Sequence, residues 1–494
     1  MLPDDHVLTK LIGVTGVLPG DPTTPGIPSK PGVPRVDPHK SIPSIPSLPI
    51  SYRDALPLLK ALNGHGPNAS DFNKYWQGGG LMQEGVKYNI GPSPDSMLLN
   101  LMNDQEYVTT PIWNVIGIIN GSIPDEVVIL GNHRDAWIAG GAGDPNSGSA
   151  AFIEVVRAFG VAIKADWKPL RTLVFASWDG EEYGLLGSTE WVEEYLPWLS
   201  ATSVAYLNVD VGSTGTKFHA SASPLLNRAL VDAVRMVPSP NQSIPGQTVL
   251  DTWDKRIRTI GSGSDFTAFQ DFAGIPSLDF GFERAPDSPV YHYHSNYDSF
   301  HWMDTFGDPQ WHYHVTMAKI WALVAANLCE SPVLSLNATD YAMGLGRYLD
   351  SVKDKAQRSS TFDEKEFSFK SLEHATTKLR DMAVKFDSYT ADLTTRLSKH
   401  VPWWQWWKKV KLFYEVRAAN TKYKLLERQF LCAGGLDDRP WFKHVVFAPG
   451  RWTGYAGATY PGLVESFEDG NVTNAERWSE IIVERLAAAA RLLE

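Results

Sequence analysis

The sequence is poor in cysteine and has no long apolar run. Cys329 and Cys432 are the only cysteines among 494 residues, too few to define a disulfide framework or a redox compartment. No apolar run approaches the roughly 20 residues that cross a membrane, and the first residues lack the basic start and apolar core of a signal peptide. The sequence itself therefore predicts neither export nor a membrane span. Sequons that would permit glycosylation in the secretory route begin at Asn68, Asn120, Asn241, Asn337 and Asn471.

Extended blocks of basic residues are also missing. The chain has 45 Lys and Arg against 56 Asp and Glu, a net charge of −11. Nucleic acid is therefore not expected as a partner. The 494 residues exceed the size at which one core stops growing, so we expect two or three domains.

Residues 1–50 contain 11 of the 33 prolines, which predicts an extended segment rather than a helix. A disordered tail and a Pro-rich ligand for another module are both compatible with this composition. The regular spacing of Ile42, Ile45 and Leu48 favours a third interpretation, an arm that lies across a folded surface. The apolar pattern of residues 52–63 then predicts a short helix closed by Gly64.

An apolar run at residues 127–130 has the pattern of a strand buried on both faces. Asn120-Gly121-Ser122 separates it from residues 112–119, so we predict that the two segments form a hairpin. Polar residues follow the run at once, first His133 and Asp135 and then, past a Gly-rich turn, Asp144. In an open α/β sheet, this end of a strand is where ligands bind.

Two further apolar strands end in the same way. Residues 173–176 lead to Glu181 and Glu182, and residues 204–207 lead to Asp210. A helix with Phe152, Val155, Val156 and Phe159 on one side, ended by Gly160, lies between the first two strands. The alternation of strands and helices predicts an α/β fold with a largely parallel sheet covered by helices.

These strand ends, together with a downstream histidine, supply ligands for metal ions. Two imidazoles and three carboxylates suit a pair of zinc ions with one bridging carboxylate and open positions for water. Glu181 would then be free to act as general base. Taken singly, each residue has a structural explanation, such as Asp144 as a helix N-cap before Pro145. The predicted ligands are His133, Asp144, Glu182, Asp210 and His294.

The remaining chain offers two open readings and one clear pattern. Residues 261–266, Gly-Ser-Gly-Ser-Asp-Phe, either cap a helix or form a loop that lines the site. Residues 368–398 and 410–431 lack Gly and Pro over long stretches and predict a helical bundle. A dense group of tryptophans is most often core, although it could also face a second subunit. They are Trp403, Trp404, Trp406 and Trp407.

With these motifs in place, the chain resembles the glutamate carboxypeptidase II and transferrin receptor family of zinc exopeptidase-like proteins. The resemblance covers nearly the whole chain and is most specific at residues 131–135, 175–191 and 293–295. It implies two zinc ions, one on His133 and Asp210 and one on Glu182 and His294, with Asp144 between them. It further implies Glu181 as general base, Tyr293 near the tetrahedral intermediate, Asp135 as the partner that orients His133, and substrate contacts at Ser262, Gly263 and Tyr455.

The resemblance also implies an arrangement of domains. Residues 1–107 would be the Pro-rich arm and a remnant of an apical protease-associated domain, residues 108–335 the zinc peptidase domain, and residues 336–494 a helical domain that forms a homodimer. By the same resemblance the protein would be membrane-anchored, in a secretory or vacuolar lumen, or extracellular. The family's first peptidase segment and most of its apical domain are not matched in this chain.

Several positions depart from the family pattern. The spacing from His133 to Asp144 is one residue longer, within residues 140–143. The family's calcium site finds Glu190 and Glu193, but its other ligands would lie upstream of Met1, so this Ca²⁺ site would be incomplete. Positions that hold cations for acidic substrates align with Ala220, Asp279, Gly281 and Gly454.

An acidic substrate side chain would therefore be buried without a cation, which is unfavourable. We expect a zinc exopeptidase acting on peptides, most simply a carboxypeptidase with weak preference for glutamate. Two alternatives remain, a catalytically silent receptor or scaffold and an aminopeptidase with the same zinc site.

Overall fold

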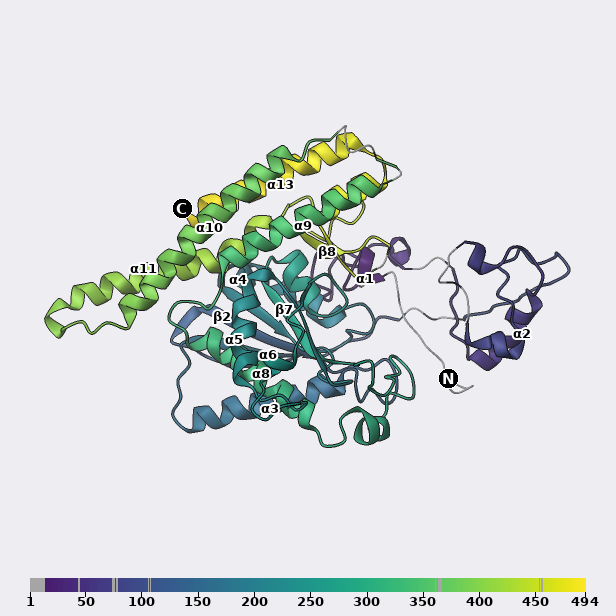
Figure 1. Cartoon of the computed structure of the whole chain (residues 1–494), viewed down its shortest axis with the longest axis horizontal. Coiled ribbons are helices and arrows are strands. Elements are labelled where there is room, and N and C mark those ends of the chain that lie inside the picture. The colour runs from purple at the N-terminus through teal and green to yellow at the C-terminus, as the bar shows by residue number, and fades with distance from the viewer. Residues whose placement is uncertain are drawn as a thin grey trace.

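The computed structural model describes residues 14–42, 45–72, 76, 79–104, 106, 108–359, 361–362, 367–452, 454 and 456–494. A small N-terminal part, a central sheet with its helices and a C-terminal set of long helices follow one another along the chain (Figure 1). The N-terminal part has few regular elements, namely α1 (Val14–Val17), α2 (Tyr52–Ala61) and short 3₁₀ turns at Pro38–Lys40, Ala69–Asp71 and Gly80–Glu84.

A seven-stranded mixed sheet in the order β1-β3-β2-β4-β7-β5-β6 forms the centre. β3, β2, β4 and β7 run parallel to one another, while β1 and β5 are antiparallel to the strands beside them, β3 and β7. The α/β class is confirmed. The strands are β1 (Val115–Ile119), β2 (Ile123–His133), β3 (Arg171–Trp178), β4 (Ser203–Asn208), β5 (Lys217–Ala222), β6 (Ile257–Thr259) and β7 (Ser277–Glu283).

Helices cover the sheet, and its central strands are wholly buried. Residues 127–130 of β2 have no exposed surface, as their apolar run predicts. α3 and α8 pack together and against β2, while α4 packs against β2 and β4. The helices of this part are α3 (Asn146–Lys164), α4 (Leu186–Thr202), α5 (Asn227–Met236), α6 (Val249–Thr252), α7 (Phe300–Trp302) and α8 (His312–Glu330), with π-helical turns at Ala268–Phe272 and Met303–Gly307.

The predicted hairpin between residues 112–119 and 127–130 is wrong. β1 and β2 both pair with β3, one on each side of it, rather than with each other. The connection crosses the start of β3, where Gly121 N–H donates to Thr172 Oγ1 at 3.1 Å. A Cβ on Gly121 would lie 2.2 Å from the backbone of Arg171, so glycine permits this close crossing rather than a tight turn.

The predicted end of α3 at Gly160 is also wrong. The helix continues to Lys164, and the N–H of Ala165 bonds back to carbonyls of its last turn. Gly160 has open space around its α-carbon, so no close contact forces a break there. The predicted apolar side is confirmed for Phe152, Val155 and Phe159, which are buried.

Long helices form the C-terminal part, as predicted. α10 packs against α9 and α13, and with α11 it forms a hairpin that extends far from the sheet (Figure 1). The helices are α9 (Ala338–Arg358), α10 (Lys370–Leu397), α11 (Trp406–Leu426), α12 (Pro461–Glu468) and α13 (Val472–Leu493), and β8 (Phe447–Pro449) pairs with β9 (Gly457–Thr459). The core reading of the tryptophans at residues 403–407 is wrong, because all four are more than half exposed.

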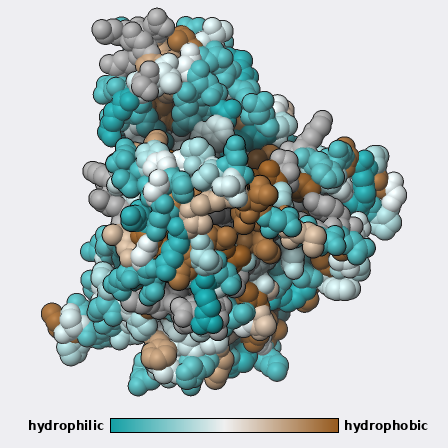
Figure 2. Space-filling model, turned by 90° about the vertical axis from the view of Figure 1, so that its right-hand side faces the viewer, coloured by the Kyte–Doolittle hydropathy of each residue, from teal (hydrophilic) through white to brown (hydrophobic). Residues whose placement is uncertain are grey.

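The N-terminal part lies at the side of the sheet (Figure 1). The predicted helix at residues 52–63 is confirmed by α2. Ile45 and Leu48 are 76% and 51% exposed, so the prediction that this apolar row packs on a folded surface is wrong for these two residues. On the face of the molecule that α2 occupies, hydrophobic side chains gather near the middle (Figure 2). Among the described residues, no helix combines the length and apolar character that crossing a membrane requires.

Candidate metal centre

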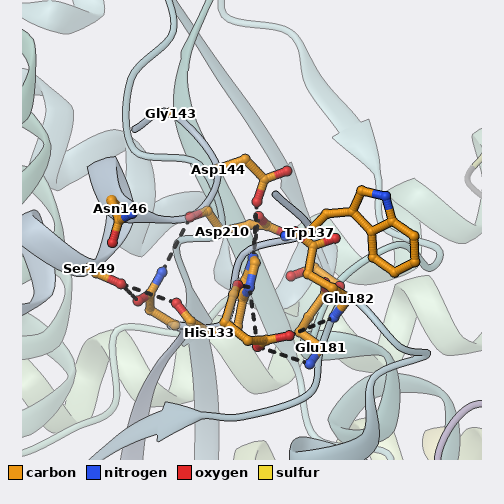
Figure 3. Close-up of polar contacts among 12 residues, drawn as sticks. His133, Trp137, Gly143, Asp144, Asn146, Ser149, Glu181, Glu182 and Asp210 are labelled. Atoms are coloured by element: carbon orange, nitrogen blue, oxygen red, sulfur yellow. Dashed lines mark hydrogen bonds and ion pairs between the residues drawn. The ribbon is translucent and has the colours of Figure 1, made fainter. Parts of the chain in front are cut away.

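Loops after three parallel strands bring the predicted ligands together. His133 is the last residue of β2, Glu182 lies in the loop after β3, and Asp210 lies two residues after β4. Asp144 and His294 come from loops that lie over the same edge of the sheet. Figure 3 shows the carboxylates of Asp144 and Asp210 directed toward the imidazole of His133.

Asp144 lies between two pairs of ligands. His133 Nε2 is 3.0 Å from Asp210 Oδ1 and 3.3 Å from Asp144 Oδ1. The second oxygen, Asp144 Oδ2, is 3.3 Å from His294 Nε2, which is 2.9 Å from Glu182 Oε2. Within each triad the ligand atoms lie within 4.8 Å of one another. One carboxylate thus serves both triads, one oxygen for each.

The donor set fits divalent cations. His133, Asp144 and Glu182 are buried, and among the described residues Asp144 Oδ1 has no hydrogen-bond donor besides the ion-pair contact with His133. Buried charges of this kind are unfavourable unless paired. Two imidazoles and three carboxylates are ligands that zinc takes, and three protein ligands per ion would leave a position open.

The raised pKa values of the cluster also indicate that its carboxylates lack compensating positive charge. Burial raises the pKa of Glu181 well above its usual value, against the opposing field of His133. Burial also raises the pKa of Glu182. For His294, burial favours the neutral ring, but hydrogen bonds to Asp144 and Glu182 outweigh it and raise its pKa to about 9. Cations would replace the protons that these groups otherwise retain.

Asp135 holds the general-base candidate in place. Its two carboxylate oxygens accept the backbone N–H groups of Glu181 and Glu182, each at 3.1 Å. Asp135 is the expected partner that orients the His133 ring, and it contacts the ring mainly through its backbone. His133 Nδ1 is 3.0 Å from the Asp135 carbonyl oxygen and 3.7 Å from the Asp135 carboxylate. The backbone N–H of Trp137 donates to Glu182 Oε1 at 2.8 Å and fixes the Glu182 side chain.

Sequence reasoning missed Asp298, which positions Asp144. Its carboxylate is buried and accepts the N–H groups of Gly143 at 2.6 Å and Asp144 at 3.0 Å, and the Tyr291 hydroxyl at 2.9 Å. A Cβ on Gly140 would lie 2.2 Å from the Asp298 carbonyl oxygen, which explains the glycine at this position. The only sequence signal is an Asp four residues after His294.

A cavity of about 310 Å³ opens beside the two triads. Glu181 and Tyr293 line it, as do Ser262 and Gly263, so the loop at residues 261–266 faces the site. Tyr293 also stacks on the His294 ring, with the ring centres 3.8 Å apart. Tyr455 lies outside the described residues.

The charged residues that line the cavity besides the proposed ligands differ from those that the resemblance leads one to look for. Arg258, which sequence reasoning missed, donates to both carboxylate oxygens of Glu283 at 2.8 and 2.5 Å. Asp279 accepts a hydrogen bond from Asn208 at 2.9 Å, and burial raises its pKa to about 7. Ala220 and Gly281 do not line the cavity.

A second acidic pair lies on α4 beneath the N-terminal segment. Glu190 accepts the N–H groups of Asp21 at 2.7 Å and Ser29 at 2.5 Å, and Glu193 accepts that of Gly26 at 3.0 Å. Burial raises the pKa of Glu190 to about 7 and that of Glu193 to about 8. Segment 20–29 therefore supplies backbone partners to the pair that the resemblance links to calcium.

Comparison with known families agrees with this geometry. Residues 114–312 match peptidase family M28, and residues 367–494 match the transferrin receptor-like dimerisation domain. The matched region contains all five predicted ligands, and the dimerisation match covers α10 to α13.

Relatives that match nearly the whole chain confirm the resemblance seen in the sequence. A probable glutamate carboxypeptidase of Arthroderma benhamiae is 44% identical and covers 97% of this chain. Probable glutamate carboxypeptidase LAMP1 of Arabidopsis thaliana is 35% identical and covers 94%, and aminopeptidase NAALADL1 of Rattus norvegicus is 32% identical and covers 96%. The chain spans 63%, 63% and 64% of these three proteins.

Proposed function

We propose that the protein is a dinuclear zinc exopeptidase that hydrolyses a peptide bond at a chain terminus. The supporting observation is the pair of largely buried triads that share Asp144, with Glu181 beside them. His133 and Asp210 would hold one zinc, and Glu182 and His294 the other. Bound zinc supplies polarisation of the peptide carbonyl and a lowered pKa for water.

The protein's own groups carry the proton transfers. Glu181 takes a proton from the attacking water and passes it to the leaving amine. Asp135 fixes the backbone of Glu181, so the carboxylate stays directed into the cavity that it lines. The hydroxyl of Tyr293, which also lines the cavity, donates a hydrogen bond to the oxyanion.

For the substrate we propose a peptide cut at its C-terminus, with weak preference for acidic residues. The resemblance and two of the relatives support a carboxypeptidase. Among the described residues that line the cavity, Arg258 is the one with an Arg or Lys side chain. Its two terminal nitrogens already donate to Glu283. An acidic side chain would have to compete with Glu283 for this partner, whereas Asp279 offers it no positive charge.

One observation favours an aminopeptidase as the second candidate. Asp279 adds to the cavity a carboxylate that is not one of the proposed ligands and could pair with a substrate amine. A relative is named as an aminopeptidase. A silent scaffold is disfavoured because every ligand position is filled and the ligands lie within reach of shared ions.

The resemblance also suggests the bounds of the domains. We propose the peptidase domain at residues 108–335, the helical domain at residues 336–494 as the contact of a homodimer, and residues 1–107 as the arm and apical remnant. The two family matches support the first and second of these parts, the peptidase and the helical domain. A membrane-anchored, lumenal or extracellular location follows from the resemblance alone.

Mass spectrometry of a mixed peptide library after incubation with the zinc-loaded protein tests the proposal, with Glu181→Gln as the matched control. Loss of C-terminal residues by the wild type alone would support the carboxypeptidase and give its side-chain preference. Loss from the N-terminus would favour the aminopeptidase. Efficient, selective removal of glutamate would contradict the weak preference, and no cleavage with zinc bound would contradict the peptidase.

A further inference from the structure

The tip of the hairpin between α10 and α11 exposes apolar side chains to an unusual degree. Residues 398–411 form this tip, and their tryptophans at 403, 404, 406 and 407 are 81%, 57%, 62% and 53% exposed. The apolar surface continues along α11, where Val410, Phe413 and Tyr414 are also exposed. Soluble proteins rarely expose so many large apolar side chains in one segment without a partner.

The charge of the tip is as unusual as its apolar surface. Residues 398–411 include four lysines and no Asp or Glu, a local charge of +4 in a chain of net charge −11. In the part of the chain that the structure describes, Lys399, Lys408 and Lys409 form no ion pair, and Lys411 lies 3.9 Å from Glu415. These ammonium groups are therefore available to an external anion.

We propose that this hairpin tip docks on an anionic lipid surface. Tryptophan prefers the interface between headgroups and acyl chains, and lysine beside it attracts anionic headgroups. Protein interfaces share the preference for tryptophan but are depleted in lysine, so the combination favours a membrane over a protein partner. The tip is at the end of a long projecting arm and can reach a flat surface (Figure 1).

A hollow beside the tip has the same dual character. A cavity of about 290 Å³ lies between the hairpin and residues Ile123, Leu170 and Pro332. Its walls include the apolar side chains of Leu412 and Val416. Lysines of the tip also line it, at positions 399 and 409. An acyl chain fits the apolar wall, while the ammonium groups suit the phosphate of an anionic headgroup.

Flotation with lipid vesicles tests the proposal on the whole chain. The protein should float with vesicles of phosphatidylcholine and phosphatidylserine, and much less with phosphatidylcholine alone. A variant with all four tip tryptophans changed to Ala should lose flotation. A variant with Lys408→Gln and Lys409→Gln should bind roughly 30-fold more weakly, because each lysine near an anionic surface contributes about a fivefold factor.

Matched controls change the same residue types elsewhere. Trp76→Ala and Trp452→Ala remove exposed tryptophans, and Lys370→Gln and Lys378→Gln remove exposed lysines of α10; all should float like the wild type. Unchanged thermal unfolding of the tip variants would show that they fold. Failure of the wild type to float, or unimpaired flotation of the four-Trp variant, would overturn the proposal. The proposal would also be overturned if the four-Trp variant floated like the wild type but sedimented as a monomer where the wild type is a dimer. A second copy of the chain would then cover the tip.

Discussion

The metal centre and the hairpin tip both depart from the usual burial of apolar and exposure of charged side chains, but in different ways. At the metal centre, charged groups are buried, with His133 1% and Asp144 5% exposed. At the tip, apolar groups are exposed, with Trp403 81% exposed. Each region thus indicates the chemistry of a partner, cations in one case and an apolar, anionic surface in the other.

The two regions differ in what the absence of a partner does to the fold. Buried carboxylates that repel one another destabilise the folded state unless protons or cations compensate them. Exposed tryptophans contact water in the folded and the unfolded chain alike, so they change folding little. We therefore expect large effects on activity and stability from changes at the centre, and effects on binding alone from changes at the tip.

The largest expected effect is that of Glu181→Gln. The change keeps the shape of the side chain but removes its ability to accept a proton, so turnover should fall on the order of 10²- to 10⁴-fold. Zinc content, measured by elemental analysis, should stay the same, because Glu181 is not one of the proposed ligands. Wild-type turnover in this variant would refute its role as general base.

Removal of metal should come next. A chelator leaves the carboxylates of the two triads without their cations, so the temperature of unfolding should fall. Zinc at about a thousand times its Kd would stabilise the native state by about 4 kcal/mol. The Asp144→Asn variant is the matched control and should respond much less to the chelator. An unfolding temperature that is insensitive to chelation in the wild type would contradict the metal assignment.

Asp298→Asn should have a smaller effect, on metal affinity. The change weakens the acceptor that holds the N–H groups of Gly143 and Asp144, and disturbing a residue that orients a metal ligand typically weakens affinity by about 10- to 100-fold. Asp308 is a matched control, a buried carboxylate that accepts N–H groups of Tyr313 and His314 outside the cavity.

Competition with a fluorescent zinc chelator measures both variants. Asp308→Asn should lower stability and leave zinc affinity unchanged. Equal zinc affinity in Asp298→Asn and the wild type would show that the loop holds Asp144 without this carboxylate.

The comparison also separates what the sequence could predict from what it could not. The ligands follow apolar strands, and a buried run such as residues 127–130 fixes where its polar residues emerge, so the cluster could be predicted from local pattern. The pairing of β1 depends on which strand edge is free, which no local signal at Asn120-Gly121 encodes. Asp298 and Arg258 act through contacts with residues 154 and 25 positions away, respectively, and were missed for the same reason.

The tryptophans at residues 403–407 illustrate the same limit from the other side. Tryptophan by itself occurs in cores, in subunit contacts and at membrane surfaces. Only the position of the hairpin, extended away from the sheet, excludes the core (Figure 1). Local composition thus identified an unusual segment, and tertiary structure decided its exposure.

The smallest expected effect concerns Glu190, which is half-buried, and Glu193, which is buried, both outside the metal centre. Burial raises their folded-state pKa values from 4.5 to about 7 and about 8. Their protonated forms therefore stabilise the fold fully below about pH 4.5, and this contribution is lost as the pH rises through about 7 to 8. The urea midpoint of the zinc-loaded protein should fall across this range relative to that of the double variant Glu190→Gln, Glu193→Gln. If the difference in urea midpoint between the wild type and the double variant does not change with pH, the raised pKa values are contradicted. If Ca²⁺ restores the urea midpoint of the wild type at the upper end of this pH range, the pair exchanges its protons for a cation.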